Sequence, residues 1–199
     1  VERRLMSDVP LGVFLSGGLD STALVAALAE RVDPARLKTF SVAFDDPTFD
    51  ESSHARRVAD HFGTDHHERT LSAKDLLALV PDLLATLDEP FADPSIVPTY
   101  LLSAFAREQV TVALGGEGGD ELLLGYPTFF AEPWARRLER APRWLRRVTL
   151  EAVVGRLPVT TGNMSLGFKA RRFLMGLDRQ ASRRHMVWIG GVPPEEHED

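Results

Sequence analysis

The 199 residues are enough for one large domain or two small ones, and 44% hydrophobic with 26% charged residues is typical of a globular protein. The net charge of −6 argues against a general binder of nucleic acid or anionic membranes, and the absence of Cys excludes disulfides, thiolate metal sites and a cysteine nucleophile. No apolar run approaches the roughly 20 residues that span a bilayer and no signal peptide opens the chain, so we expect a cytoplasmic location. Because the chain begins with Val in a charged segment, we expect it to be a piece of a longer protein.

Four strand-like runs alternate with four helical patterns along the first part of the chain. The strand-like runs cover 11–15, 37–44, 66–71 and 110–114, and the helical patterns cover 21–32, 50–62, 73–87 and 98–109. Strands that alternate with helices of this length are typical of βαβ units, so we predict an α/β fold with a parallel sheet flanked by helices. Pro81, inside the third helical pattern, predicts a kink or break there.

The character of the sequence changes after about residue 127. The segment 134–157 is helical with an Arg-rich face, which we interpret as a solvated face or a domain contact, and 162–191 has more helical patterns. Packing roles are expected for the tryptophans of this part, Trp134, Trp144 and Trp188. We therefore predict an α/β core over 1–127 and a helical extension of the same domain over 128–199.

The stretch LGVFLSGGLDSTALVAAL (11–28) joins an apolar strand to a helix through Ser16, Gly17 and Gly18. Open α/β sheets bind ligands in the loops at the carboxyl ends of their strands. Glycines let backbone N–H groups approach a ligand, the helix N-terminus adds partial positive charge, and hydroxyls such as that of Ser21 add donors. The corner therefore predicts an anion site, although it has neither the lysine of GxxxxGK[ST] nor the spacing of GxGxxG.

Asp20 makes this anion site more specific. A carboxylate about 4 Å from a phosphate charge is repelled by roughly 4 kcal/mol at an effective dielectric constant of about 20. A divalent cation between the two removes the repulsion, and Mg²⁺ takes one or two carboxylates together with phosphate oxygens. The simpler alternative is that 16–18 is only a tight turn and that Asp20 caps the helix.

A second loop repeats this architecture. The stretch VTVALGGEGGDELLLGYPTF (110–129) is an apolar strand followed by a glycine loop that carries Glu117, Asp120 and Glu121. Glycines around several carboxylates favour another strand-end loop held close to a metal or a ligand. Taken alone, the loop is also compatible with a calcium-type loop or a solvated turn.

On these residues the chain resembles a known family. SGGLDS (16–21) resembles the pyrophosphate-binding loop of the N-type ATP pyrophosphatases, and together with GGEGGDE (115–121) it is similar to the synthetase domain of glutamine-dependent asparagine synthetases. Supporting stretches are SDVPLGVFLSGGLDS (7–21), TFSVAFDD (39–46), FDESSHAR (49–56) and DEPFADPSIVPTY (88–100). The resemblance covers about residues 1 to 190 and implies a Rossmann-like, adenine nucleotide α-hydrolase-like sheet with a helical C-terminal portion.

The resemblance also implies a role for each matching residue. Pyrophosphate would be held by the first loop, through Ser16, Gly17, Gly18, Asp20 and Ser21. The rest of ATP would contact Phe14, Leu15, Leu19, Val42, Gly115 and Gly116. Asp20 and Asp120 would coordinate Mg²⁺ and act in catalysis, and Glu117 would orient ammonia or accept a proton from it as the amide forms.

The implied activity is that of an ATP-dependent, amide-forming ligase. The aspartate side-chain carboxylate would attack the α-phosphorus of ATP, and ammonia would convert β-aspartyl-AMP to asparagine and AMP. The implied partners are aspartate, ammonia and a glutaminase domain with an N-terminal Cys, a residue that this chain lacks. A homodimer is a further candidate, whereas no nucleic acid or membrane partner is expected. We also expect the later RxPFLD part of the synthetase domain to lie outside this chain, which leaves open whether the fragment is active alone.

Two alternatives stay open from the sequence. A related amidotransferase or a β-lactam-synthetase-like enzyme would share the two loops and act on another carboxylate, and a nucleotide-binding fragment without turnover would share the fold alone. The loop 88–98 is a candidate aspartate pocket, with Asp88, Glu89 and Asp93 as its contacts. His54 is interpreted as a helix-surface residue rather than part of the ATP site, and His66 and His67 as surface or core histidines rather than metal ligands.

Overall fold

The computed structural model describes most of the first two thirds of the chain and shorter stretches after it. The described residues are 5–48, 50–89, 93, 95–142, 144, 148, 152, 155–156, 165–177 and 179–189, with only the backbone of Ser182. The chain forms two compact units, an α/β unit over Val1–Gly119 and a helical unit over Asp120–Asp199. The domain boundary predicted after residue 127 stays a prediction.

The α/β unit is built around a four-stranded parallel sheet in the order β3-β2-β1-β4. Its strands are β1 (Leu11–Phe14), β2 (Lys38–Phe44), β3 (Asp65–Leu71) and β4 (Val112–Leu114). All four lie where the strand-like runs predict them, to within two residues. The predicted α/β fold with a parallel sheet flanked by helices is therefore confirmed.

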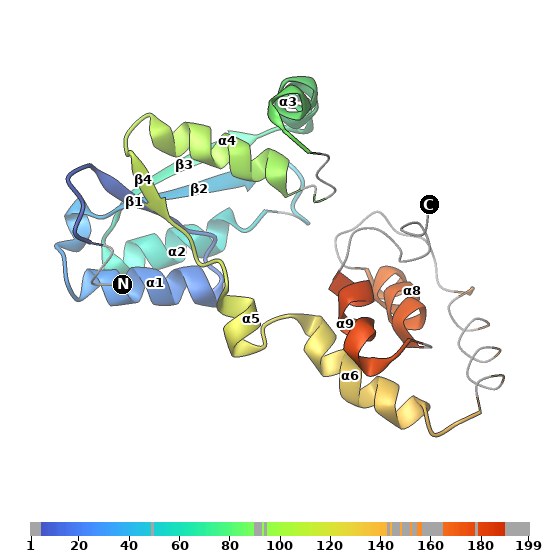
Figure 1. The fold of residues 1–199 in the computed structure, drawn as a ribbon. Coiled ribbons are helices and arrows are strands. Elements are labelled where there is room, and N and C mark those ends of the chain that lie inside the picture. The colour runs from blue at the N-terminus through green and yellow to red at the C-terminus, as the bar shows by residue number, and fades with distance from the viewer. Residues whose placement is uncertain are drawn as a thin grey trace. The chain divides into compact units, whose positions relative to one another are not determined.

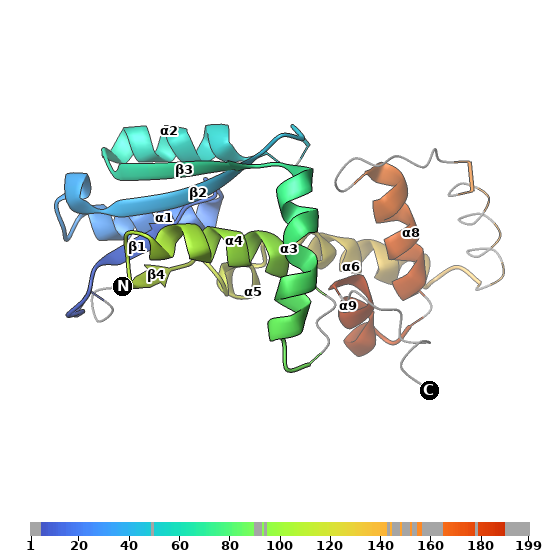
Figure 2. The same ribbon diagram turned by 90° about the horizontal axis from the view of Figure 1, so that it is seen from above.

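Helices cover both faces of this sheet. The helices of the unit are α1 (Leu19–Ala29), α2 (Ser52–Phe62), α3 (Ala73–Thr86) and α4 (Ile96–Arg107), with a 3₁₀ turn at Pro34–Arg36. Figures 1 and 2 show α1 and α2 on one face and α4 on the other, with α3 against α4. Helix α3 continues through Pro81, so the break expected there does not occur. Its first turn is secured by a capping box between Ser72 and Asp75, and a proline removes only one backbone donor.

The core of the α/β unit lies on both faces of the sheet because successive strand residues point to opposite sides. Val13 and Leu15 pack with Val25, Leu28, Leu37, Ala55 and Ala59 under α1 and α2. On the other face, Phe40 packs with Phe105, Ala106 and Val110 under α4. Strands β1 and β2, which are buried on both faces, need such apolar residues, and this is why their runs are readable in the sequence.

Four helices are found among the described residues around and beyond the unit boundary. These are α5 (Gly119–Leu123) at the unit boundary, α6 (Pro127–Leu138), α8 (Leu166–Leu177) and α9 (Ala181–Ile189). Trp188 is buried against Ala135 and Leu177, as expected, but Trp134 and Trp144 are 62% and 69% exposed, so a packing role for those two is wrong. None of the helices in the described part of the chain has the length and apolar character needed to cross a bilayer.

Candidate functional site

The two glycine loops leave neighbouring strands at the same edge of the sheet. Strands β1 and β4 pair in parallel with Val13 opposite Leu114, so the loops that begin at Leu15 and Gly115 start side by side. The connection from β1 to β2 runs through α1 on one face, whereas the connection from β3 to β4 runs through α3 and α4 on the other (Figure 1). Open α/β sheets bind ligands at such a switch between faces, beyond the carboxyl ends of the two strands.

Glycines of the second loop pack directly against the first loop. A Cβ atom built on Gly116 would lie 2.9 Å from Ser21 N and 3.1 Å from Asp20 Cβ, and one on Gly119 would collide with the Asp20 carboxyl group. Gly116 meets backbone, which cannot move aside, so glycine is required there, whereas a side chain at position 119 would first have to displace the Asp20 carboxyl group. The structure therefore brings Gly116 and Gly119 together with Asp20 and Ser21.

The first loop is held in shape by its own hydrogen bonds. Gly18 N donates to Ser16 Oγ (3.2 Å), and the hydroxyl of Ser21 lies 3.1 Å from Ser16 Oγ and 3.3 Å from Gly18 O. Gly17 has φ +80°, a conformation that residues with a Cβ rarely adopt. The loop is therefore preorganised before any ligand binds.

Asp20 does not cap α1. Gly18 is the N-cap residue, and Asp20 lies in the first turn, where the partial positive charge of the helix end stabilises a carboxylate. The Asp20 carboxylate forms no hydrogen bond or ion pair with any residue in the described part of the chain. The simpler interpretation of Asp20 as a cap is wrong, and its carboxylate is available to a cation.

Asp20 offers one carboxylate, which is enough for a cation that takes its other ligands from a bound phosphate. Within the described residues there is no group of three or more His, Asp or Glu side chains that could hold a metal ion. Mg²⁺ needs no such group when phosphate oxygens complete its octahedron. A single carboxylate beside a glycine loop is the kind of donor that Mg²⁺ uses together with phosphate oxygens, and its use here stays a prediction.

The carboxylates of the second loop have different surroundings. Glu117 is exposed and forms no hydrogen bond to a described residue, whereas Glu121 accepts a hydrogen bond from the Tyr126 hydroxyl (2.7 Å), which lowers the pKa of Glu121. Asp120 lies against Gly125, on which a Cβ would collide with the Asp120 carboxyl group. Asp120 is the first residue of the helical unit, and its sharing of a cation with Asp20 stays a prediction.

Comparison with known proteins assigns the family. The family model for asparagine synthase matches residues 1–192. The chain belongs to the asparagine synthase family. Among the relatives are the glutamine-hydrolysing asparagine synthetase 1 of Bacillus subtilis, 38% identical over 151 residues, and the glutamine-hydrolysing asparagine synthetase of Homo sapiens, 32% identical over 159 residues.

These alignments cover 75% of this chain in both cases but only 23% of the Bacillus protein and 28% of the human protein. The chain thus spans about a quarter of the length of the curated relatives that it matches. Among solved structures, the chain is similar to an ammonia-dependent NAD synthetase from Campylobacter jejuni in complex with nitrate. The alignment covers 63% of this chain and 55% of the NAD synthetase chain, with 18% sequence identity and a TM-score of 0.42.

The residues predicted to contact the rest of ATP lie along β1, β2 and the two loops. The side chain of Leu15 is buried in the core and its N–H donates to Phe40 O (2.8 Å), so only its carbonyl can face a ligand. Leu19 is 78% exposed, and Phe14 and Val42 are half-buried. Their contacts with a nucleotide stay predictions.

The loop proposed as an aspartate pocket is only partly described. Pro90, Phe91, Ala92 and Pro94 lie outside the described residues, and Asp88 and Glu89 are exposed. Asp93 accepts a hydrogen bond from Ser95 N (2.9 Å), which secures the start of α4. Its proposed role in binding aspartate stays a prediction.

The sequence alone does not predict that the first loop contacts helix α2. A Cβ on Gly17 would lie 2.5 Å from Ala55 N and 2.6 Å from His54 Cβ, so the first turn of α2 packs on the loop backbone. His54 is exposed, as expected for a helix surface, yet it is next to the anion loop. The signal that could have predicted this is strand order, because β1 and β2 are neighbours and the helices that follow them begin at the same edge.

Proposed function

We propose that this chain is the ATP-binding part of a ligase that makes asparagine from aspartate and ammonia, with AMP and pyrophosphate as the other products. The observation that carries the proposal is the close packing of Gly116 and Gly119 on Asp20, which brings two ligand-type loops to one edge of the sheet. Family membership supports the same chemistry. Because the chain spans about a quarter of its relatives, the activity of the whole protein is part of the proposal.

In this proposal the first loop binds the leaving pyrophosphate. Ser16 and Ser21 offer hydroxyl groups, and Gly17 and Gly18 allow a close approach of phosphate oxygens to the backbone. The N-terminus of α1 contributes partial positive charge at the same place. Because the loop is already ordered, little conformational entropy is lost when the anion binds.

Asp20 and Asp120 are the residues that would hold Mg²⁺. The ion would supply charge neutralisation between these carboxylates and the phosphates, which otherwise repel one another by several kcal/mol. Phe14, Leu15, Leu19, Val42, Gly115 and Gly116 would line the rest of the nucleotide site.

The chemistry requires positioning and charge neutralisation more than covalent participation of the protein. A carboxylate oxygen of aspartate forms a bond to the α-phosphorus as the bond to the β-phosphate oxygen breaks. The nitrogen of ammonia then attacks the acyl carbon, and AMP leaves with the carboxylate oxygen. Glu117 is exposed and unpaired within the described residues, and we assign it to orient ammonia and accept its proton.

Ammonia is proposed to come from a glutaminase domain or from free ammonium. The chain has no cysteine that could serve as a glutaminase nucleophile. We place the reaction in the cytoplasm, where ATP and aspartate are available, and the homodimer stays a candidate.

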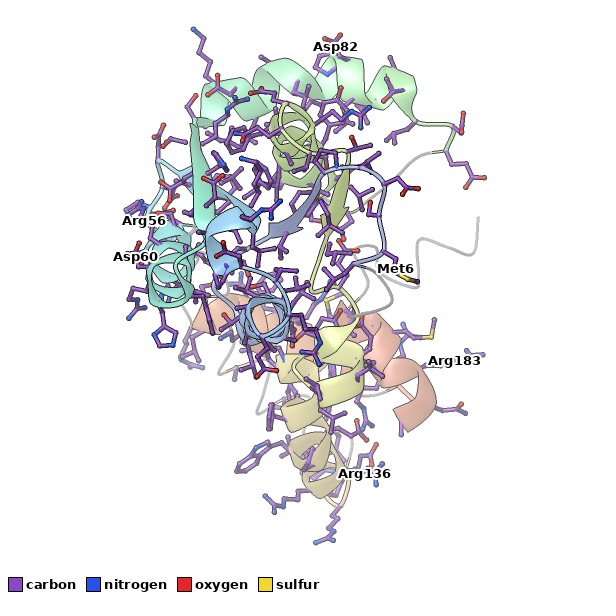
Figure 3. All side chains as sticks on the ribbon, turned by 90° about the vertical axis from the view of Figure 1, so that its left-hand side faces the viewer. Met6, Arg56, Asp60, Asp82, Arg136 and Arg183 are labelled. Atoms are coloured by element: carbon purple, nitrogen blue, oxygen red, sulfur yellow. The ribbon has the colours of Figure 1, made fainter. Side chains whose placement is uncertain are left out.

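The test is pyrophosphate release from ATP with aspartate and ammonium, together with equilibrium binding of Mg-ATP. Aspartate-dependent release supports the proposal, release only with another carboxylate indicates a related amidotransferase, and binding without release indicates a nucleotide-binding fragment. Asp20→Asn should weaken Mg-dependent ATP binding by roughly tenfold or more, because a carboxylate ligand is lost. The matched control is Asp82→Asn, on an exposed position of α3 (Figure 3), which should bind as the unsubstituted chain does. Unchanged binding by Asp20→Asn contradicts the proposal.

A further inference from the structure

The two loops of the site carry no positive side chain of their own. Residues 15–21 read LSGGLDS and residues 115–119 read GGEGG, so neither contains Lys or Arg. A departing pyrophosphate carries several negative charges, and one Mg²⁺ compensates only part of them. A further cationic or N–H donor group near Gly17 would therefore strengthen the site.

Helix α2 places such a group next to the loop. Gly17 contacts the backbone and Cβ of His54, so the His54 side chain begins directly beside the first loop. Arg57 lies three residues later, one turn along the same face, and its Nη2 is 2.6 Å from His54 Nδ1. Both side chains are exposed, so neither is committed to the core.

The Arg57 contact determines which nitrogen of His54 carries the proton. A guanidinium group only donates hydrogen bonds, so His54 Nδ1 must accept, and the imidazole proton then sits on Nε2. His54 therefore presents an N–H donor away from Arg57, and Arg57 keeps further N–H groups for a second acceptor. The neighbouring Arg56, labelled in Figure 3, is instead paired with Glu68 of β3 at 2.8 Å.

The negative groups at the start of α2 do not cancel this arrangement. Asp50 accepts hydrogen bonds from Phe44 N, Ser52 N and Ser52 Oγ, and the Ser52 backbone bond is the main cause of its lowered pKa. These donors hold the Asp50 carboxylate at the end of β2. Glu51 is exposed, and its carboxylate forms no hydrogen bond or ion pair with His54 or Arg57 among the described residues.

We propose that His54 and Arg57 form a second wall of the pyrophosphate site, with His54 Nε2–H donating to a phosphate oxygen and Arg57 adding positive charge. This inference rests on the proposed function, because it assumes that the first loop holds pyrophosphate. His54 and Arg57 would then favour bond cleavage by stabilising the leaving group.

The experiment measures dissociation constants of Mg-pyrophosphate and of AMP for the chain and four variants. His54→Ala and Arg57→Ala should each weaken Mg-pyrophosphate by about tenfold, the usual loss for a charge-assisted hydrogen bond, and leave AMP unchanged. His54→Gln should restore most of the affinity, because its amide nitrogen can occupy the position of Nε2. His61→Ala, in the last turn of the same helix and also exposed, is the control and should change neither constant.

A second readout does not depend on variants. In ¹⁵N-labelled chain, the imidazole signals of His54 should report the Nε2–H form and should shift when pyrophosphate is added, whereas those of His61 should not. Equal pyrophosphate binding by His54→Ala, Arg57→Ala and the unsubstituted chain, or an unmoved His54 signal, overturns this inference alone. Failure of the unsubstituted chain to bind Mg-pyrophosphate overturns both the inference and the proposed function.

Discussion

The α/β unit and the helical unit bury different kinds of side chain. The largest fully buried side chains of the α/β unit are Phe40, Leu15 and Leu28, whereas that of the helical unit is Arg184. Among the described residues, the helical unit has an apolar cluster around Ala135, Leu177 and Trp188, and the α/β unit has one cluster on each face of the sheet.

Arg184 is paired on all sides within the described part of the helical unit. Its guanidinium donates to Glu132 (3.0 and 3.1 Å) and to Glu139, and its Nε donates to Gly176 O (3.1 Å). The guanidinium also lies 5.9 Å from the ring centre of Trp188. Burying a charge is unfavourable unless it is paired in this way, so α6, α8 and α9 depend on a polar network where the sheet depends on apolar area.

The two units can be followed separately, because all three tryptophans, Trp134, Trp144 and Trp188, lie in the helical unit. Tryptophan fluorescence therefore reports unfolding of the helical unit alone. Hydrogen exchange of α1 and α2 reports the α/β unit.

The largest effect is expected for Arg184→Met. Loss of the guanidinium leaves Glu132 and Glu139 without their shared partner, and removal of one member of a buried ion network costs about 3 kcal/mol. Urea unfolding followed by tryptophan fluorescence should show this loss, while exchange in α1 and α2 stays unchanged. The control is Arg183→Met, an exposed neighbour on α9 (Figure 3), which should cost far less; equal losses would contradict the role of the network.

A smaller effect, confined to the α/β unit, is expected for Gly17→Ala. The new Cβ meets the α2 backbone and the residue must keep φ +80°, which together should cost about 2 kcal/mol. Gly63→Ala separates the two causes, because Gly63 has φ +71° but no atom within 4 Å of the added Cβ. Hydrogen exchange of α2 measures both variants. If they cost the same, the contact between Gly17 and α2 contributes nothing.

The smallest effect is a pH dependence of the α/β unit that comes from His66. Burial lowers the pKa of His66, whose ring nitrogens lie 2.9 Å from Thr39 Oγ1 and 3.3 Å from Ser41 Oγ. The unfolded chain, with an ordinary pKa of about 6.5, then binds more protons than the folded chain. The His66 contribution to stability is therefore complete above about pH 6.5 and is lost as the pH falls through the window down to the lowered folded pKa.

His66→Gln should flatten this part of the pH profile of unfolding. Stability measured by hydrogen exchange at several pH values between neutral and about pH 5 makes the comparison. His61→Gln, an exposed position, should leave the profile as it is. An unchanged profile for His66→Gln would show that His66 is not the group responsible.

Local sequence predicts the α/β unit well because its signals are short-range. The run LGVFL forms β1, which ends at Phe14. Gly18 is the N-cap of α1, and the Ala- and Leu-rich pattern that follows forms the helix. In the helical unit the pattern over 134–157 indicates a helix but misses the first turns of α6. This helix begins at Pro127, since a proline in the first turn is compatible with a helix start. An Arg-rich face does not reveal that Arg184, farther along the chain, is buried.

By itself, the sequence determined the strands, the helices of the α/β unit and the two glycine loops, because each depends on backbone conformation and on apolar alternation within a few residues. Only the tertiary structure decided that Gly116 and Gly119 pack on Asp20, that α2 packs on Gly17, and that Arg184 is buried between two glutamates. These contacts join residues roughly 30 to 100 positions apart in the chain. Strand order and helix packing bring such residues together, and a sequence pattern within a few residues does not encode either.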